Sequence, residues 1–220
     1  MTVRIDFYFD YLSPYSYLAW EILEKRYSFF QCKGDFHFYP VVLSKVIHHY
    51  ETKGPGEILP KRNYLLKDCL RLATKEEILL KGPPKLPFNS LMALRLSLTS
   101  LHSNNLRQRL LISQLFKYTW GSGGDISSPE ELTQVLERWH STPHESTQLL
   151  AAEGSKEARV ELRENISRAL SFGVFGVPTF VVNEKELFWG LDSLENLERY
   201  INNNDLLDEK NYQVFLQKFN

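Results

Sequence analysis

The chain has 220 residues, a formal net charge of -1, and 26 Lys and Arg against 27 Asp and Glu. Nucleic acids and anionic membrane surfaces require a clustered basic face, so neither is an expected partner. Hydrophobic residues make up 43% of the chain, which is enough for a packed core. The length allows one domain of ordinary complexity or one domain with a large insertion. No apolar run approaches the ~18 residues of a membrane span, and the first residues lack the basic and apolar regions of a signal peptide.

Cysteine and histidine usage favours a reducing, cytoplasmic location without a metal site. Cys32 and Cys69 are far apart and form no CxxC or metal-ligand spacing, so we expect buried or incidental thiols. His48 and His49 are adjacent. Neighbouring side chains diverge on a helix or a strand and no further ligand is close in the sequence, so we expect an exposed pair and no metal.

The chain opens with a predicted strand, helix and second strand. Residues 3–9 alternate apolar and polar side chains with the period of a β-strand. An apolar helix is expected from residue 13 to about residue 27, and a second strand at residues 36–40 after a turn at residues 33–35. This order predicts parallel strands joined by a right-handed crossover.

The middle of the chain, from about residue 60 to residue 173, predicts helices and almost no strand. Ser128 and Thr142 each begin a capping-box pattern with proline at the first helical position. Gly173 is the expected end of the last of these helices. The strongest helical runs are residues 90–96, 106–120 and 156–172.

Strand patterns return only near the end. Residues 179–182 and 186–189 flank a short connection and predict a hairpin. A helix is then expected to begin at Asp192, with Glu195 completing a capping box. The layout is a βαβ half and a ββα half separated by helices, which predicts an α/β thioredoxin-like fold with an all-helical insertion. The predicted domains are residues 1–57 with 174–220, thioredoxin-like, and residues 58–173, the inserted helical domain.

Three motifs carry a resemblance to a known family. Residues 7–19 read FYFDYLSPYSYLA, residues 175–180 read FGVPTF and residues 189–192 read WGLD. They resemble the opening and the two C-terminal motifs of 2-hydroxychromene-2-carboxylate isomerases and kappa-class glutathione transferases, which have a DsbA-like thioredoxin fold. The resemblance extends to about residue 200, and residues 202–220 lie outside it. Weaker matches are residues 64–71, 88–90 and 120–121.

Ser13 supports two interpretations. Serine followed by Pro14 is an ordinary helix N-cap. A helix start directly after the first strand also presents unpaired N–H groups and a partial positive charge, which stabilise an anion. Disulfide oxidoreductases hold a cysteine thiolate there, whereas Ser13 and Ser16 occupy both CxxC positions here. We therefore expect the Ser13 hydroxyl to donate to the sulfur of bound glutathione and to favour its thiolate.

The resemblance implies a glutathione site assembled from distant segments. It implies a cis bond between Val177 and Pro178, opposite Ser13, that leaves the Val177 backbone free to pair with an extended peptide. Proline is also common at the first residue of a strand without any such role. Asp192 is expected to meet the ammonium of the γ-glutamyl end. The further implied contacts are Pro14, Tyr15, Thr52 and Leu191.

Three positions depart from the family pattern. Thr52 stands where an asparagine is expected, and Leu191 stands where a polar residue is usual, so its contact would come from the backbone. Phe88 stands where the isomerases have a tyrosine, which weakens the assignment to hydroxychromene chemistry. Three tyrosines either line a substrate pocket or belong to the core, the commoner role: Tyr8, Tyr17 and Tyr64.

The leading function that the resemblance implies is a glutathione-dependent isomerase of the 2-hydroxychromene-2-carboxylate type, which acts on a small conjugated carboxylate from aromatic catabolism. A kappa-like glutathione transferase is the alternative within the family. A non-catalytic thioredoxin-fold module that binds peptides along the Val177–Pro178 edge is the alternative from another class. Thiol–disulfide exchange is the least expected activity, because the catalytic cysteine pair is missing. Whether the chain forms a homodimer stays open.

Overall fold

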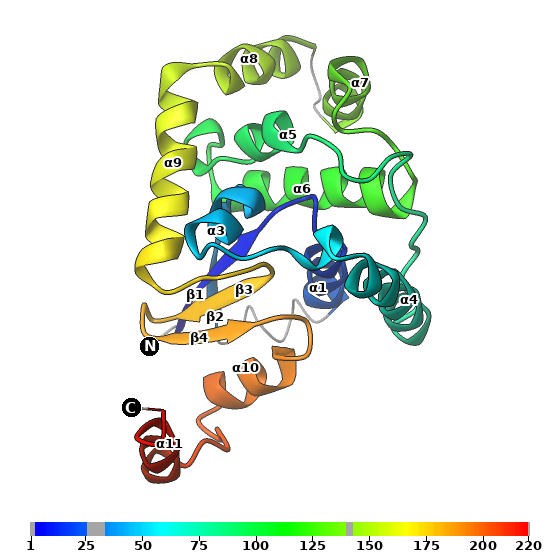
Figure 1. Cartoon of the computed structure of the whole chain (residues 1–220). Coiled ribbons are helices and arrows are strands. Elements are labelled where there is room, and N and C mark those ends of the chain that lie inside the picture. The colour runs from blue at the N-terminus through cyan, green and yellow to red at the C-terminus, as the bar shows by residue number, and fades with distance from the viewer. Residues whose placement is uncertain (1–2, 26–33, 140–142, 220) are drawn as a thin grey trace.

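The computed structural model describes residues 3–25, 34–139 and 143–219. At its centre lies a four-stranded mixed sheet in the order β2-β1-β3-β4 (Figure 1). β1 pairs with β2 in parallel and with β3 antiparallel, so the two predicted halves meet in one sheet and the thioredoxin-like fold is confirmed. The strands are β1 (Val3–Phe9), β2 (Gly34–Pro40), β3 (Thr179–Val182) and β4 (Glu186–Trp189).

Helices cover both faces of the sheet. Phe7 belongs to the core shared with α1 and α10, and Tyr8 to the smaller core shared with α3 and α9. The polar face predicted for β1 is therefore buried as well. Its Asp6 accepts hydrogen bonds from Arg4 and Arg168, each at 2.8 Å. These helices are α1 (Pro14–Lys25), α3 (Leu43–His49), α9 (Lys156–Ser171) and α10 (Leu194–Ile201).

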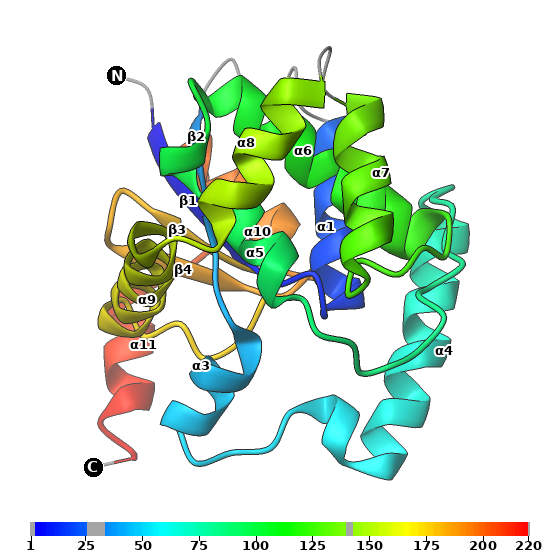
Figure 2. The ribbon, with the colours of Figure 1, turned by 90° about the horizontal axis from the view of Figure 1, so that it is seen from above.

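The segment between the two halves is helical, as predicted. Figure 1 shows α5 to α8 stacked on one side of the sheet, and Figure 2 shows α4 on the outer side of α1. The division at residues 57/58 and 173/174 stays a prediction; it assigns α9, which packs on the sheet, to the insertion. The elements are η1 (Pro55–Glu57), α4 (Leu59–Lys75), α5 (Leu91–Leu96), η2 (Thr99–Leu101), α6 (Asn105–Phe116), η3 (Lys117–Gly121), α7 (Pro129–Trp139) and α8 (Pro143–Glu153).

Several helix ends differ from the prediction. The α-helix expected to reach residue 120 ends at Phe116 and continues as the π-turn η3. Ser128 caps α7 as predicted, because its hydroxyl oxygen accepts the N–H of Glu131 at 3.2 Å. The Glu131 carboxylate instead accepts from the Tyr118 hydroxyl, so the reciprocal half of that capping box is missing. Thr142 lies outside the described residues.

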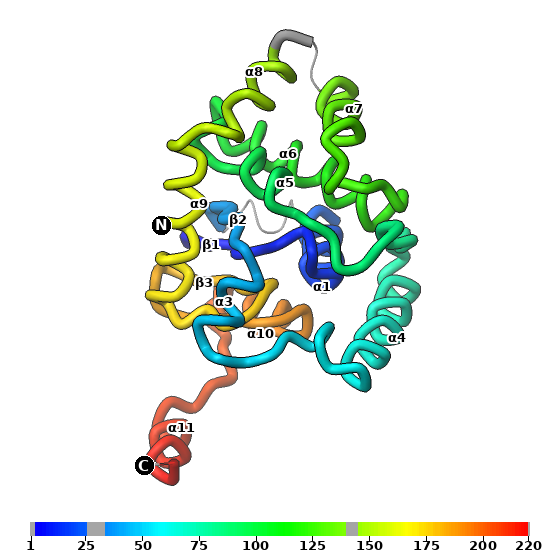
Figure 3. The backbone as a smooth tube through the Cα atoms, turned by 45° about the horizontal axis from the view of Figure 1, so that its top comes forward, coloured from blue at the N-terminus to red at the C-terminus, as the bar shows by residue number. Residues whose placement is uncertain are grey.

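The sequence did not predict a last helix, α11 (Glu209–Leu216). It follows α10 and lies below the sheet, at the lower end of the molecule in these views (Figures 1 and 3). None of its eight described residues is buried. Across the described residues, no helix is both long enough and apolar enough to cross a membrane.

Candidate functional site

Ser13 lies at the N-terminus of α1, where β1 has just ended. Its hydroxyl oxygen accepts the N–H of Ser16 at 3.1 Å and lies 3.4 Å from the carbonyl oxygen of Val177, to which the hydroxyl donates. Only 5% of the residue is exposed. The predicted N-cap and the predicted approach to Val177 are therefore both confirmed, and one hydroxyl serves both.

The Val177–Pro178 bond is cis, as predicted. The peptide after it is held in place, since Gly190 N–H donates to the Pro178 carbonyl at 2.9 Å and the Thr179 hydroxyl donates to the Gly176 carbonyl at 2.7 Å. Among the described residues the Val177 N–H donates to no backbone carbonyl. The Val177 edge therefore keeps the donor that an extended peptide would pair with.

Asp192 is exposed and folds back over the turn that precedes it. Gly190 has φ +88°, and a Cβ added there would lie 2.6 Å from the Asp192 carboxylate. The Gly190 N–H is hydrogen-bonded to the Pro178 carbonyl, so the turn that carries Asp192 is joined to the residue that follows Val177. The expectation that Asp192 caps the following helix is wrong. α10 begins at Leu194 with Ser193 at the N-cap position, since the left-handed turn at Gly190 directs the Asp192 side chain away from the helix start.

Tyr15 joins α1 to α4. Its hydroxyl donates to the Asp68 carboxylate at 2.8 Å, and burial, followed by that hydrogen bond, raises the pKa of Tyr15 above its ordinary value. Tyr15 is thus a neutral donor already committed to Asp68. The neighbouring Cys69 is buried, as expected, and burial raises the pKa of its thiol to about 12. Cys32 lies outside the described residues.

Asp10, which the sequence analysis did not single out, organises the Ser13 loop, residues 10–13. Its buried carboxylate accepts from the N–H of Leu12 at 3.0 Å, the N–H of Leu43 at 2.8 Å and the hydroxyl of Ser90 at 2.7 Å. Desolvation raises the pKa of Asp10. One side chain therefore ties the loop to the starts of α3 and α5. A carboxyl at the end of an apolar strand was the available signal, but its partners Leu43 and Ser90 lie far away in the sequence.

The inserted helices also hold the Ser13 loop. The Trp120 indole donates to the carbonyl of Tyr11 at 2.7 Å, and the Tyr11 hydroxyl shares a 2.6 Å hydrogen bond with that of Ser97. The Phe88 ring packs edge-on against Trp120, with ring centroids 6.5 Å apart. The weak motif matches at residues 88–90 and 120–121 therefore correspond to residues that position the loop.

The remaining residues predicted for the site lie in several different environments. Thr52 is exposed, its hydroxyl donates to the carbonyl of Ile47, and no hydrogen bond among the described residues joins it to Ser13. Leu191 is half-buried against the main core, and Pro14 is buried as the first residue of α1. The tyrosines and histidines divide between core and surface: Tyr8 and Tyr17 are buried, while Tyr64, His48 and His49 are exposed.

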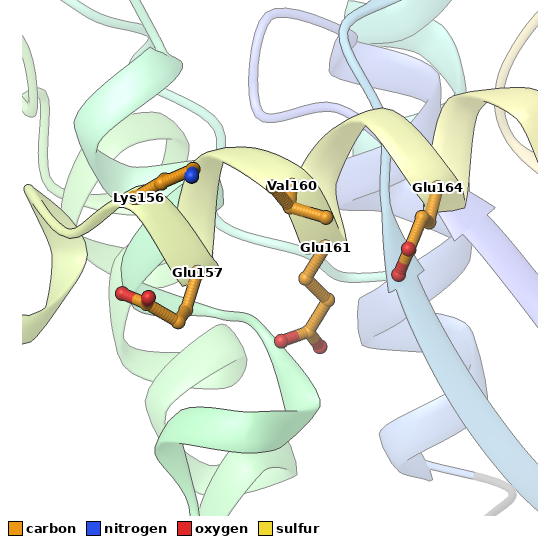
Figure 4. A pocket seen from close by; sticks show the side chains of 5 residues that line it. All are labelled: Lys156, Glu157, Val160, Glu161 and Glu164. Carbon is orange, nitrogen blue, oxygen red and sulfur yellow. The ribbon is translucent and has the colours of Figure 1, made fainter.

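A hollow on the surface lies elsewhere, along the first half of α9 (Figure 4). It is lined by Lys156, Glu157, Val160, Glu161 and Glu164. The lining contains no residue of the Ser13 loop and is mostly acidic. We therefore assign this hollow no part in the candidate site.

Comparison with known proteins identifies the family to which this fold belongs. The family model of the DSBA-like thioredoxin domain matches residues 4–202. A 2-hydroxychromene-2-carboxylate isomerase from Pseudomonas sp. (strain C18) is 30% identical over 91% of each chain, and human glutathione S-transferase kappa 1 is 23% identical over 88% of each. A solved 2-hydroxychromene-2-carboxylate isomerase superposes with a TM-score of 0.79 at 25% identity, over 91% of this chain and 95% of that one.

The chain therefore belongs to the DSBA-like thioredoxin family, in the group that holds 2-hydroxychromene-2-carboxylate isomerases and kappa-class glutathione transferases.

Proposed function

We propose that this chain is a glutathione-dependent isomerase acting on a conjugated carboxylate of the 2-hydroxychromene-2-carboxylate type. The observation that carries the proposal is the Ser13 hydroxyl at the start of α1, 3.4 Å from the Val177 carbonyl, in a chain with serine at both CxxC positions. The relatives' names supply the substrate class. The lack of a catalytic cysteine pair suits a reducing compartment, so we also propose a cytoplasmic location.

The residues present fit glutathione. The Val177 backbone offers a donor without a backbone partner among the described residues. The exposed Asp192, on the turn that is hydrogen-bonded to Pro178, carries a carboxylate suited to an ammonium group. The buried Ser16 hydroxyl has no hydrogen-bond partner among the described residues. A tripeptide with one amino end and one thiol matches these groups. Bound glutathione would supply the thiol nucleophile that the chain itself lacks.

The chain contributes electrostatics and positioning. The partial positive charge at the start of α1 favours an anion over a neutral thiol. Of the first backbone N–H groups of the helix, that of Tyr15 has no acceptor among the described residues, because Ser13 accepts those of Ser16 and Tyr17. The Ser13 hydroxyl adds one donor, and each unit by which the thiol pKa falls corresponds to about 1.4 kcal/mol. Asp10, Trp120 and Ser90 hold the loop, so these donors are fixed before the ligand arrives.

A kappa-like glutathione transferase is the second candidate. Phe88 supports it, because it stands where the isomerases have a tyrosine, and the human kappa relative supports it by its similarity over 88% of this chain. The transferase would use the same Ser13 arrangement and consume the thiol. The two functions differ in the acceptor substrate, so an assay with both kinds of acceptor distinguishes them.

The test is calorimetric titration with glutathione, followed by assays of 2-hydroxychromene-2-carboxylate isomerisation and of transfer to an electrophilic aryl halide. We expect binding and isomerisation without loss of glutathione. Asp192→Asn should weaken binding about tenfold, the effect of one charged hydrogen bond, whereas Asp205→Asn, on the C-terminal segment, should not. Transfer without isomerisation would favour the second candidate, and absence of binding would reject both.

A further inference from the structure

Helix α4 concentrates positive charge in a chain that is nearly neutral overall. The whole chain has a formal net charge of -1, and Asp68 is the single acid of the helix. A local excess of one charge sign creates a potential that attracts ions of the opposite sign from solution. The basic side chains of α4 are all exposed, and they are Lys61, Arg62, Lys67, Arg71 and Lys75.

Most of this charge has no neutralising partner. Of these basic side chains, only Lys75 forms an ion pair within the part of the chain that the structure describes, with Glu76 at 3.8 Å. The Asp68 carboxylate accepts the Tyr15 hydroxyl, and the carboxylate of Glu57, just before the helix, accepts a backbone N–H at 2.7 Å. The remaining basic groups therefore act on ions in solution.

Two contacts show how α4 lies along α1. Near the start of α1, the Tyr15 hydroxyl donates to Asp68, in the middle of α4, at 2.8 Å. At the end of α1, the Lys25 ammonium donates to the carbonyl oxygens of Glu76 and Glu77, at the end of α4. The two helices therefore run in the same direction, and the part of α4 before Asp68 extends roughly 13 Å past Tyr15, at 1.5 Å per residue.

This register brings the positive helix beside the Ser13 loop. Tyr15 is two residues from Ser13. Lys67 directly precedes the Asp68 that Tyr15 contacts, and Arg71 follows it by about one helical turn. Because the Debye length is about 30 Å at 0.01 M salt, charges at this range act on a ligand at the Ser13 loop without touching it. The partial positive charge at the start of α1 adds to the same potential.

We propose that α4 is an electrostatic guide, which speeds the association of anionic ligands with the Ser13 loop. The inference rests on the proposed function, because that function supplies the ligands. Glutathione carries two carboxylates against one ammonium group, and the proposed acceptor carries a carboxylate, so both are attracted by a positive helix. The guide acts at long range, and this role is separate from the short-range contacts expected at Val177 and Asp192.

The experiment measures the association rate of glutathione with the full-length protein by stopped-flow tryptophan fluorescence, at about 0.01 M and about 1 M salt, where the Debye length is about 30 Å and about 3 Å. We expect the wild-type rate to fall about tenfold between the two. The variant Lys67→Gln with Arg71→Gln should associate about threefold slower at low salt and at the wild-type rate at high salt. Lys67→Glu with Arg71→Glu should slow association at low salt further, while dissociation stays unchanged.

The matched control, Lys156→Gln with Arg159→Gln, removes the same charge from the exposed surface of α9, which Figures 1 and 2 show on the far side of the molecule from α4. It should keep the wild-type rate at both salt concentrations. Thermal unfolding checks that each variant is folded.

The outcomes separate this inference from the proposed function. If the wild type binds glutathione at a rate that salt does not change, or if the α4 variants match the α9 control, the guide is overturned and the proposed function stands. A wild type that does not bind glutathione overturns both. Phosphatidylserine vesicles provide the last arm. If the charge-reversed α4 variant loses vesicle binding that the wild type shows, yet binds glutathione at the wild-type rate, α4 faces a membrane surface and the proposal is overturned.

Discussion

At the scale of the residue, the single hydroxyl of Ser13 makes two contacts. Its oxygen caps α1 by accepting the Ser16 N–H, and its hydroxyl faces Val177 across the site. A cap alone is worth about 1 kcal/mol to the helix. A donor aimed at a bound sulfur changes the charge state of the ligand. The first effect appears in the stability of the protein, and the second appears in its activity.

Ser13→Ala should therefore lower kcat by about tenfold or more, the range for loss of one positioned donor, while the Kd for glutathione changes less than threefold. The reason is that Val177 and Asp192 would still bind the tripeptide. Steady-state kinetics and calorimetry measure the two quantities. Lys25→Gln, at the exposed other end of α1, is the control and should keep most of the activity. Equal loss of kcat in both variants would show a general disturbance of α1.

Cys69 should be inert in the folded protein. Burial raises the pKa of its thiol to about 12, so very little thiolate is present at pH 8. In a Cys32→Ser variant, where Cys69 is the remaining cysteine, we expect an aromatic disulfide reagent to react at least about 100-fold slower than in the urea-unfolded chain. Fast reaction of the folded variant would contradict the buried position of this thiol.

Asp10 should leave a signature in the pH dependence of stability. Desolvation raises its pKa in the folded protein, so the folded state binds the proton more tightly than the unfolded chain. Its contribution to the free energy of unfolding therefore falls as pH rises from about 4, the unfolded value, through the folded pKa. Asp10→Asn lacks this titration. Urea unfolding should show the advantage of wild type over Asp10→Asn shrinking with rising pH, and a growing advantage would contradict the direction.

At the scale of the element, the turn between β4 and α10 brings Asp192 to the site. Gly190 adopts φ +88° there and leaves no room for a Cβ beside the Asp192 carboxylate. An L-residue in a left-handed conformation costs about 1–2 kcal/mol. The turn therefore depends on glycine twice, for its backbone conformation and for the space that Asp192 occupies.

Gly190→Ala should lower the free energy of unfolding by about 1–2 kcal/mol and weaken glutathione binding, because the Asp192 carboxylate must move. Thermal unfolding and calorimetry measure the two effects. Gly56→Ala is the matched control, since a Cβ there meets nothing within 4 Å, and it should leave both unchanged. Unchanged binding in Gly190→Ala would remove Asp192 from the site.

The elements that the sequence predicted well are those with local signals. β1 follows from its alternation, β3 and β4 follow from two strand patterns around a short connection, and Gly173 ends α9 through its positive φ of +76°. The start of α10 was predicted wrongly at Asp192. The left-handed conformation of Gly190 cannot be recognised from a capping pattern, and Ser193 takes the N-cap position instead. The role of Asp10 was missed since it depends on Leu43 and Ser90, which only the fold brings near.

At the scale of the whole molecule, the candidate site sits where the two halves of the fold meet. β1 delivers Ser13, the connection before β3 delivers Val177, and the turn after β4 delivers Asp192, while the helical insertion supports the loop through Trp120. Neither half contains the site alone. The resemblance predicted Ser13, Val177 and Asp192 because its motifs lie in both halves of the chain. The hydrogen bond from Trp120 of the insertion to the loop could be found only in the structure.

The effect of Ser13 on a bound thiol is measured by the ultraviolet absorbance of the thiolate of bound glutathione, followed as a function of pH in the wild type and in Ser13→Ala. We expect the bound thiol to titrate at least about one unit below the ~8.5 of a free thiol, and we expect Ser13→Ala to move this pKa back towards the free value. A bound thiol that titrates at the free value in the wild type, or at the same lowered value in both proteins, would contradict this expectation.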